Sequence, residues 1–241
     1  MFALLVSLYT FITPLPAAPV HYKLVNKSTV DLGMGGMPPI ALTMSAFVSI
    51  TMTDSATGKV ASIVIDSSTF DAGEMGAAIA AQMGDSPNGV TLHAYIINGK
   101  VQQQITPSTT NIQAMQLAPA VQLLLSGMRS AHAGESWIDS TLADTAVSAM
   151  ATKASLVTEW KASAGAAGAM QFDGTVTGTT SVGGGQMQMD MQTSGASHLT
   201  TRLGQLPTVA TSASSGSGNM NIGGQAMTMK LSTEVSATQI P

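Results

Sequence analysis

Apolar and polar residues alternate along most of the chain with a period of two, which is the pattern of β-strands whose two faces have different surroundings. The clearest example is Ile40–Met52, where every second residue from Ile40 onward is apolar and most of the residues between are Ser or Thr. The same alternation predicts further strands over the segments His21–Val30, Lys59–Ser67, Val90–Ile97, Lys100–Ile105, Ala146–Ala162, Ala169–Val182, Gln186–Leu203, Thr208–Ser217 and Gln225–Ile240.

Short segments rich in Gly, Asn and Asp separate these strands and predict antiparallel hairpins. The strongest hairpin signal is Asn98-Gly99, because both residues tolerate the positive φ angles of a tight two-residue turn. Asp54–Gly58 predicts a second hairpin. Further turns are expected at Gly183–Gly185, Gly204–Pro207, Gly216–Gly218 and Gly223-Gly224. The Ala-rich segment Glu74–Met83 is expected to form a short helix.

The period changes in Ser108–Ser130, where apolar residues recur at steps of three and four and therefore lie along one stripe of a helix. This stripe contains Ile112, Met115, Leu117, Val121, Leu124, Leu125 and Met128. Thr109 or Thr110 is expected to cap the helix, Pro119 to kink or split it, and Gly127 and Gly134 to mark its exit.

Together these patterns predict a mainly β fold: a strongly curved antiparallel sheet or half-barrel with the helix packed on its apolar face. Residues 20–241 are expected to form a single β-rich domain, with 108–130 as its helical plug. The positions expected to face the apolar interior, or a ligand inside it, are Ile112, Met115, Val121, Leu124, Leu125 and Met128.

Composition narrows the possible partners. Charged residues make up 9% of the chain, against about 25% in an ordinary soluble domain, so the surface is expected to be neutral. A net charge of −4 with only 9 basic residues excludes a nucleic-acid footprint. The absence of cysteine excludes disulfides and thiolate metal sites.

The first 19 residues are apolar and predict either a secretory signal peptide that is removed or a retained anchor. The segment has no Lys or Arg before its apolar run, unlike a standard signal peptide, and the run Phe2–Ile12 is too short to span a bilayer. Its candidate contacts with a membrane or a partner are Phe2, Leu4, Leu5, Leu8, Tyr9 and Phe11.

Candidate chemistry is sparse. The chain has 17 methionines, and Met187, Met189 and Met191 are spaced like the thioether pairs of periplasmic copper proteins. Packing of these side chains in a core is the favoured interpretation, because residues i and i+2 of a strand are about 7 Å apart and a metal would need ligands from a neighbouring strand. No cofactor or metal site is assigned.

Catalytic residues are not predicted either. The four histidines have no second histidine or carboxylate at the sequence spacing of a metal site or a catalytic triad. Asp139 and Asp144 are interpreted as residues of a solvated turn near Trp137. The two tryptophans, Trp137 and Trp160, are interpreted as core or rim aromatics, and the chain is expected not to be an enzyme.

The long hairpins, the apolar helix in mid-chain and the exit Gly134-Glu135-Ser136-Trp137 resemble exported bacterial β-sheet proteins of uncharacterised function. More loosely, they resemble the half-barrel carriers that move lipids or lipoproteins across the periplasm. The resemblance covers residues 20–240, and its only local motif is four residues long. The carriers imply an open concave sheet around helices and a lipid-binding interior.

The leading functional hypothesis is a non-enzymatic, membrane-extrinsic structural subunit on the periplasmic side of a bacterial membrane complex. Its partners would be the subunits of that complex, with the membrane surface and lipid as further possibilities. The most specific form of the hypothesis is a photosynthetic reaction-centre–light-harvesting assembly. The alternative is a periplasmic carrier that binds lipid or another apolar ligand in a half-barrel. The two differ in whether the space between helix and sheet is filled by side chains or open.

Overall fold

The computed structural model of the chain describes residues 18–33, 38–73, 84–98, 100–102, 105–108, 111–147, 150–184, 187–222 and 225–241. The strands are β1 (Val20–Asp31), β2 (Ile40–Ser55), β3 (Gly58–Asp71), β4 (Thr91–Ile97), β5 (Lys100–Val101), β6 (Thr106–Pro107), β7 (Ser136–Val147), β8 (Met150–Ala164), β9 (Met170–Gly184), β10 (Met187–Thr201), β11 (Val209–Ile222) and β12 (Gln225–Ile240). The helical elements are α2 (Ile112–Met115), α3 (Ala118–Ser126) and the 3₁₀ turn η2 (Ala166–Gly168).

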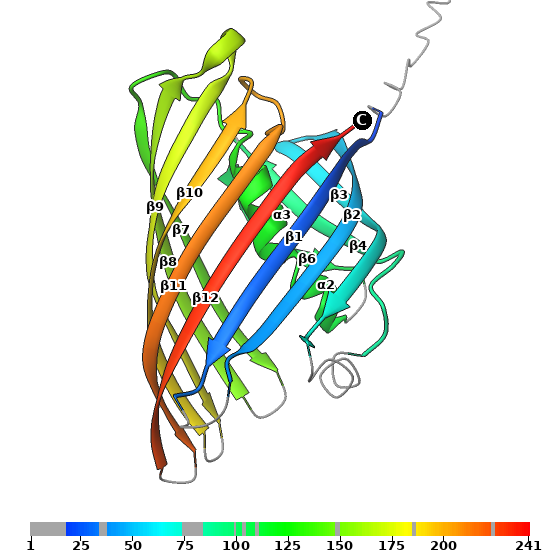
Figure 1. Cartoon of the computed structure of the whole chain (residues 1–241). Coiled ribbons are helices and arrows are strands. Elements are labelled where there is room, and N and C mark those ends of the chain that lie inside the picture. The colour runs from blue at the N-terminus through cyan, green and yellow to red at the C-terminus, as the bar shows by residue number, and fades with distance from the viewer. Residues whose placement is uncertain are drawn as a thin grey trace, which may run out of the picture.

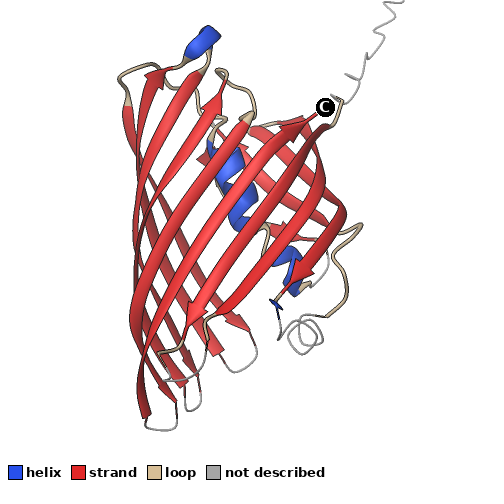
Figure 2. Ribbon diagram, viewed as in Figure 1, coloured by secondary structure: helices blue, strands red, loops and turns tan. Residues whose placement is uncertain are grey.

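In the described part of the chain, eleven strands form one antiparallel sheet in the order β5-β4-β3-β2-β1-β12-β11-β10-β9-β8-β7, and β6 pairs with β4 (Figure 1). The first and last strands are neighbours, with His21 opposite Ile240. The sheet is open and strongly curved, and α3 lies inside the curve (Figure 2). The predicted fold class, a curved antiparallel sheet with a helix on its apolar face, is confirmed.

The predicted helix is split in two, as Pro119 indicated. α2 ends at Met115, and Pro119 lies in the first turn of α3, where its missing N–H costs no helical hydrogen bond. The predicted cap was wrong: Asn111 caps α2, and its side-chain oxygen accepts a hydrogen bond from the Ala114 N–H at 2.8 Å. Gly127 is the C-cap of α3, as predicted.

α3 packs against β1, β11, β12 and β5. Three residues of its predicted stripe, Val121, Leu124 and Leu125, are fully buried. Burying such a side chain contributes about 1.5–3 kcal/mol each to the stability of the fold. The facing side of the sheet supplies the rest of the core, whose large, fully buried members include Leu24, Val48, Ile50, Ile63, Ile65, Leu92, Phe172 and Leu199.

Two polar side chains of β1 hold the helical segment and the β10–β11 loop in place. Gln116 lies at the break between α2 and α3, and its carbonyl oxygen accepts a hydrogen bond from Nδ2 of Asn26 at 2.8 Å. Tyr22 donates from its hydroxyl to the Pro207 carbonyl oxygen at 2.7 Å, in the loop between β10 and β11. Burial raises the pKa of the Tyr22 hydroxyl, so this group stays protonated and remains a donor.

Glycines on the helix side of β9 and β11 are covered by large side chains from neighbouring strands. Gly174 lies opposite Trp160, whose ring would be 2.7 Å from a Cβ added at this glycine. Gly178 lies opposite Leu156 in the same way. On β11, a Cβ at Gly216 would lie 2.9 Å from Sδ of Met191. Where a large side chain lies over a glycine, the two positions together occupy little space above the sheet. We infer that these pairs permit the tight curvature of β8–β12.

Three element boundaries differ from the sequence-based prediction. The segment predicted as one strand over Ala146–Ala162 belongs to two strands, because β7 runs to Val147 and β8 begins at Met150. Gly216–Gly218, predicted as a turn, lies inside β11, where the Met191 side chain lies next to Gly216 and the backbone of β10 lies close to Gly218. In the segment predicted as a strand over Lys100–Ile105, the described residues Lys100 and Val101 form β5, and the Gln102 N–H donates to the Tyr95 carbonyl oxygen at 2.8 Å. The predicted helix Glu74–Met83 lies outside the described residues.

The packing of the β10–β11 loop on α3 can be tested at Gly127. Its φ of −72° is open to alanine, and the loss of glycine's backbone freedom would by itself stabilise the protein by about 0.4–1 kcal/mol. The new Cβ would, however, clash with the ring of Pro207. We expect Gly127→Ala to lower the free energy of unfolding by about 1–3 kcal/mol, measured by urea denaturation.

Gly183→Ala is the matched control, because its Cβ would meet no atom within 4 Å. Its free energy of unfolding should be unchanged or higher by up to about 1 kcal/mol. A Gly127→Ala variant as stable as the control would show that the loop is not packed on the helix.

Candidate functional site

The predicted interior residues line the contact between α3 and the sheet. Val121, Leu124 and Leu125 are fully buried there, and Met128 is buried at the end of the helix. Met115 is half-buried, whereas the side chain of Ile112 lies outside the described part of the structure. The residues predicted to contact a membrane or partner, Phe2, Leu4, Leu5, Leu8, Tyr9 and Phe11, also lie outside it. The described helix residues therefore form a packed core.

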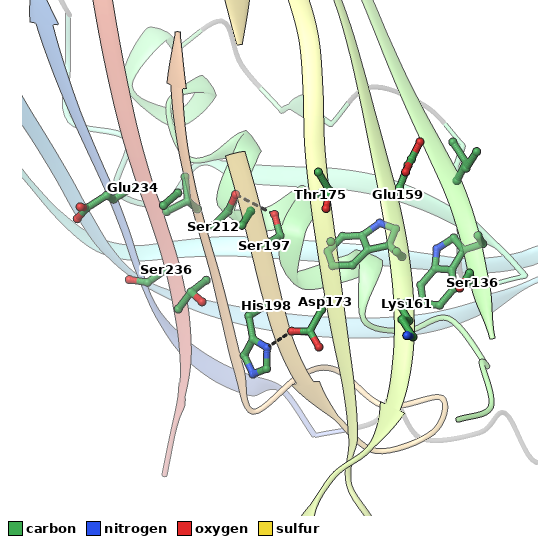
Figure 3. A pocket seen from close by; sticks show the side chains of 18 of the residues that line it. Ser136, Glu159, Lys161, Asp173, Thr175, Ser197, His198, Ser212, Glu234 and Ser236 are labelled. Atoms are coloured by element: carbon green, nitrogen blue, oxygen red, sulfur yellow. Dashed lines mark hydrogen bonds and ion pairs between the residues drawn. The ribbon is translucent and has the colours of Figure 1, made fainter. Parts of the chain in front are cut away.

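Two grooves lie on the opposite side of the sheet, which we call the helix-free face: the strand side chains that point away from α3. The first groove has a volume of about 1090 Å³ and crosses β7–β12 and β1. Figure 3 shows side chains that line it. Its lining on the helix-free face includes Val25, Ile138, Thr175, Ala196, Thr211 and Ala213. A strongly twisted sheet has the shape of a saddle, so both of its faces are concave in one direction. The helix-free face is therefore also concave, along a diagonal different from the one on which α3 lies.

The first groove holds charged groups of both signs. Asp173 on β9 lies between His198 of β10 and Lys161 of β8 in the strand register. Its Oδ1 is 2.7 Å from Nδ1 of His198 (Figure 3). Lys27 of β1 lies opposite Glu234 of β12. Charges that alternate in sign across neighbouring strands leave the groove with little net potential.

The His198–Asp173 pair escaped the sequence analysis because the two residues are 25 positions apart. Only the register of β9 against β10 brings them together. The hairpin between these strands was predicted, but its turn was placed at Gly183–Gly185, whereas the register pairs Gly184 with Met187, and only that register pairs Asp173 with His198.

The second groove, with a volume of about 960 Å³, lies further along the same strands and is almost uncharged. Its lining consists mainly of hydroxyl and amide side chains, among them Thr29, Thr177, Thr179, Gln192, Ser194, Ser215, Ser217 and Ser232. Asp31 and Lys230, which lie opposite each other in the register, are its charged residues. The groove therefore offers hydrogen-bonding groups in rows along several strands.

A third polar cluster lies on the same face, at a β-bulge in β3. The register places Phe47 opposite Ser67 but Val48 opposite Ile65, so Asp66 is an extra residue. Asp66 then reaches Ser49, whose hydroxyl donates to its carboxylate at 2.6 Å. The same hydroxyl oxygen is 3.0 Å from Nδ1 of His21. In a catalytic relay the imidazole lies between carboxylate and hydroxyl. Here the hydroxyl lies in the middle, so its proton points at the carboxylate.

The tryptophans belong to a buried aromatic cluster near the edge strand β7. The rings of Trp137 and Trp160 stack with centroids 6.1 Å apart, and Phe172 meets Trp137 edge-on at 5.1 Å. Arg129 lies over the Trp137 ring at 4.8 Å, and Trp137 donates from Nε1 to Asp139 at 3.1 Å. Asp139 is therefore part of a packed cluster on a strand, and its predicted place in a solvated turn was wrong. Asp144 also lies within β7.

No protein-family model and no curated protein matched the chain when it was compared with known proteins. Within the described ranges, no three His, Cys, Asp or Glu residues lie close enough to hold a metal ion. No helix of the described segments is long and apolar enough to cross a membrane. Inference about function therefore depends on the two faces of the sheet.

The contrast between the two faces can be tested with single cysteines, because the natural chain contains none. Ser215 is exposed in the second groove, whereas Val121 is fully buried under α3. We expect Ser215→Cys in the folded protein to react with a maleimide as quickly as after unfolding, and Val121→Cys to react only after unfolding. Rapid labelling of Val121→Cys, or protection of Ser215→Cys in the purified protein, would contradict the assignment of faces.

Proposed function

We propose that this protein is a non-enzymatic, membrane-extrinsic structural subunit that binds to the periplasmic side of a bacterial membrane complex. The observation that carries the proposal is the difference between the two faces of the sheet. One face has α3 packed on it. The other has two long grooves, and no described helix lies over them.

The filled face favours a subunit over a carrier. A half-barrel carrier of lipid needs an open cavity between its helix and its sheet. Here Leu124 and Leu125 of α3, and Leu24 on the facing strand β1, have no exposed surface. Both grooves are lined mainly by residues of the helix-free face. A half-barrel binding a stoichiometric lipid under α3 would require these side chains to separate.

The helix-free face has the chemistry of a protein contact. The cores of protein interfaces are depleted in charged residues, and interfaces overall are about as apolar as the remaining surface. The grooves combine rows of Ser and Thr with isolated apolar side chains, among them Ile138, which is 61% exposed. Phe47 and Tyr95 are further large exposed residues on this face. A partner surface with complementary hydrogen-bonding groups would bury few charged groups in the second groove, whose charged lining residues are Asp31 and Lys230.

One end of the sheet is the candidate membrane-proximal end. β1 begins there at Val20, beside Ile240 at the end of β12 (Figure 1). The apolar segment of residues 1–19 joins the sheet at this end, so a retained anchor would hold the end against the membrane. Leu203, in the nearby β10–β11 loop, is 52% exposed. An apolar side chain at this end is compatible with insertion among lipid headgroups.

A photosynthetic reaction-centre–light-harvesting assembly remains the most specific form of the proposal. That form is tested by the pigment content of the complex with which the protein co-purifies. The broader proposal requires only that the host complex be a membrane assembly.

The test is gentle detergent solubilisation of native membranes, followed by size separation and reading of the protein's N-terminal sequence. We expect the protein to migrate with a large membrane complex and to leave it only under harsher conditions. A free monomer with a start near Ala18 would contradict the proposal.

A second measurement assigns the contact face. Ser194→Cys, in the second groove, should react with a maleimide in the purified protein but be protected in the complex. The matched control is Asp85→Cys, in an exposed loop that lines neither groove. We expect this control to react in both states. If Ser194→Cys were labelled equally in the complex and in the monomer, the helix-free face would not be the interface.

A further inference from the structure

Three methionines form a row across neighbouring strands, on the side of the sheet that carries α3. In the strand register Met189 of β10 lies opposite Met220 of β11, and Met220 lies opposite Met227 of β12. All three share the alternation of the buried residues on their strands. Met220 is about ten residues along β11 from Ala210, near the helix, which is roughly 33 Å of strand, so the row is far from α3.

This row brings together methionines from neighbouring strands, which a metal site needs and which the spacing within one strand does not provide. Methionines at i and i+2 of one strand are about 7 Å apart, whereas directly opposite residues of antiparallel strands have Cβ atoms about 4.5–5.5 Å apart. Methionine has three rotatable bonds and a polarisable thioether. The outer two side chains can therefore bring their sulfur atoms to the central one above β11. Soft thioether ligands select Cu(I) among the metal ions of the cell.

Other methionines on this face have a packing role that the row does not share. Sδ of Met191 lies over Gly216, and Met191 and Met229 both flank Gly218 in the register. The Met191 side chain therefore fills the space beside Gly216. In the described register the row pairs with no glycine: Met189 lies opposite Met220 and Val182, and Met220 lies opposite Met227. Met220 is buried, while Met189 and Met227 are half-buried, so an ion could reach the row from solvent.

We propose that Met189, Met220 and Met227 form a thioether site for one soft monovalent cation, Cu(I) in the cell. Thioethers are neutral, so the bound ion would keep its charge, and the half-exposed position of the row limits the desolvation cost. The nearby charged residues Asp190 and Lys230 alternate to the opposite face of their strands. They neither neutralise nor repel the ion at close range. The proposal does not rest on the proposed function.

The test is titration of the purified full chain with Ag(I), a soft ion without redox chemistry in air, and with Cu(I) under anaerobic conditions against a chromogenic chelator. Native mass spectrometry gives the stoichiometry, and X-ray absorption at the metal edge gives the number of sulfur ligands. We expect one ion per chain with three sulfur ligands, and no binding of Zn²⁺.

The variant Met189→Leu/Met220→Leu/Met227→Leu removes the sulfur atoms at nearly constant volume, so the fold should be kept, as checked by circular dichroism. The matched control, Met191→Leu/Met229→Leu, changes the neighbouring pair on the same face. We expect the row variant to lose at least about tenfold in affinity, the smallest loss usual for a perturbed metal site, and the control to bind like the natural chain.

Equal affinity of the row variant and the natural chain would overturn the site. So would an equal loss in both variants, or binding of several ions per chain without a preferred stoichiometry. Each of these results would mean that the methionines of this face serve packing alone.

Discussion

The structure depends on one packing constraint: a strongly curved sheet with an apolar concave side must have that side filled. α3 meets the constraint with Val121, Leu124 and Leu125, which are buried against β1, β11 and β12. The helix is short, and side chains of β1 form hydrogen bonds that hold it in place. Asn26 bonds the carbonyl left free at its N-terminal break, while Tyr22 holds the β10–β11 loop over its C-terminal end. Isolated helices of this length are unstable in water, so tertiary contacts must supply the stability of α3.

Away from the helix, large side chains cover glycines on part of the same face. Trp160, Leu156 and Met191 fold over glycines of the neighbouring strands. These pairs let the long strands β8–β12 curl without a second layer, and the curl gives the opposite face its grooves. Structure and proposed function are linked here, because the curvature that the glycines permit shapes the surface we assign to a partner. The row of methionines lies at the far end of these strands on the same face. Its methionines lie opposite one another and not opposite glycines.

The fold was largely predictable from the sequence, because two-residue alternation survives in almost every strand and one segment alone follows helical spacing. The errors have local causes. Gly216 and Gly218 were predicted as a turn because glycine breaks most strands, yet here the Met191 side chain lies next to Gly216 and the backbone of β10 lies close to Gly218. Asp139 was placed in a turn because its partners, Arg129 and Trp137, meet it only after the chain has folded. The grooves and the His198–Asp173 pair depend on register and twist, which no single strand encodes.

The central claim is that the chain's own helix fills the concave face, so that no ligand is needed there. Native mass spectrometry of protein purified without any delipidation step tests it most directly. The account predicts that the folded protein has the mass of the polypeptide alone, with any added mass explained by metal ions. A stoichiometric lipid that stays bound until the protein unfolds would contradict the account and would make α3 the lid of a carrier.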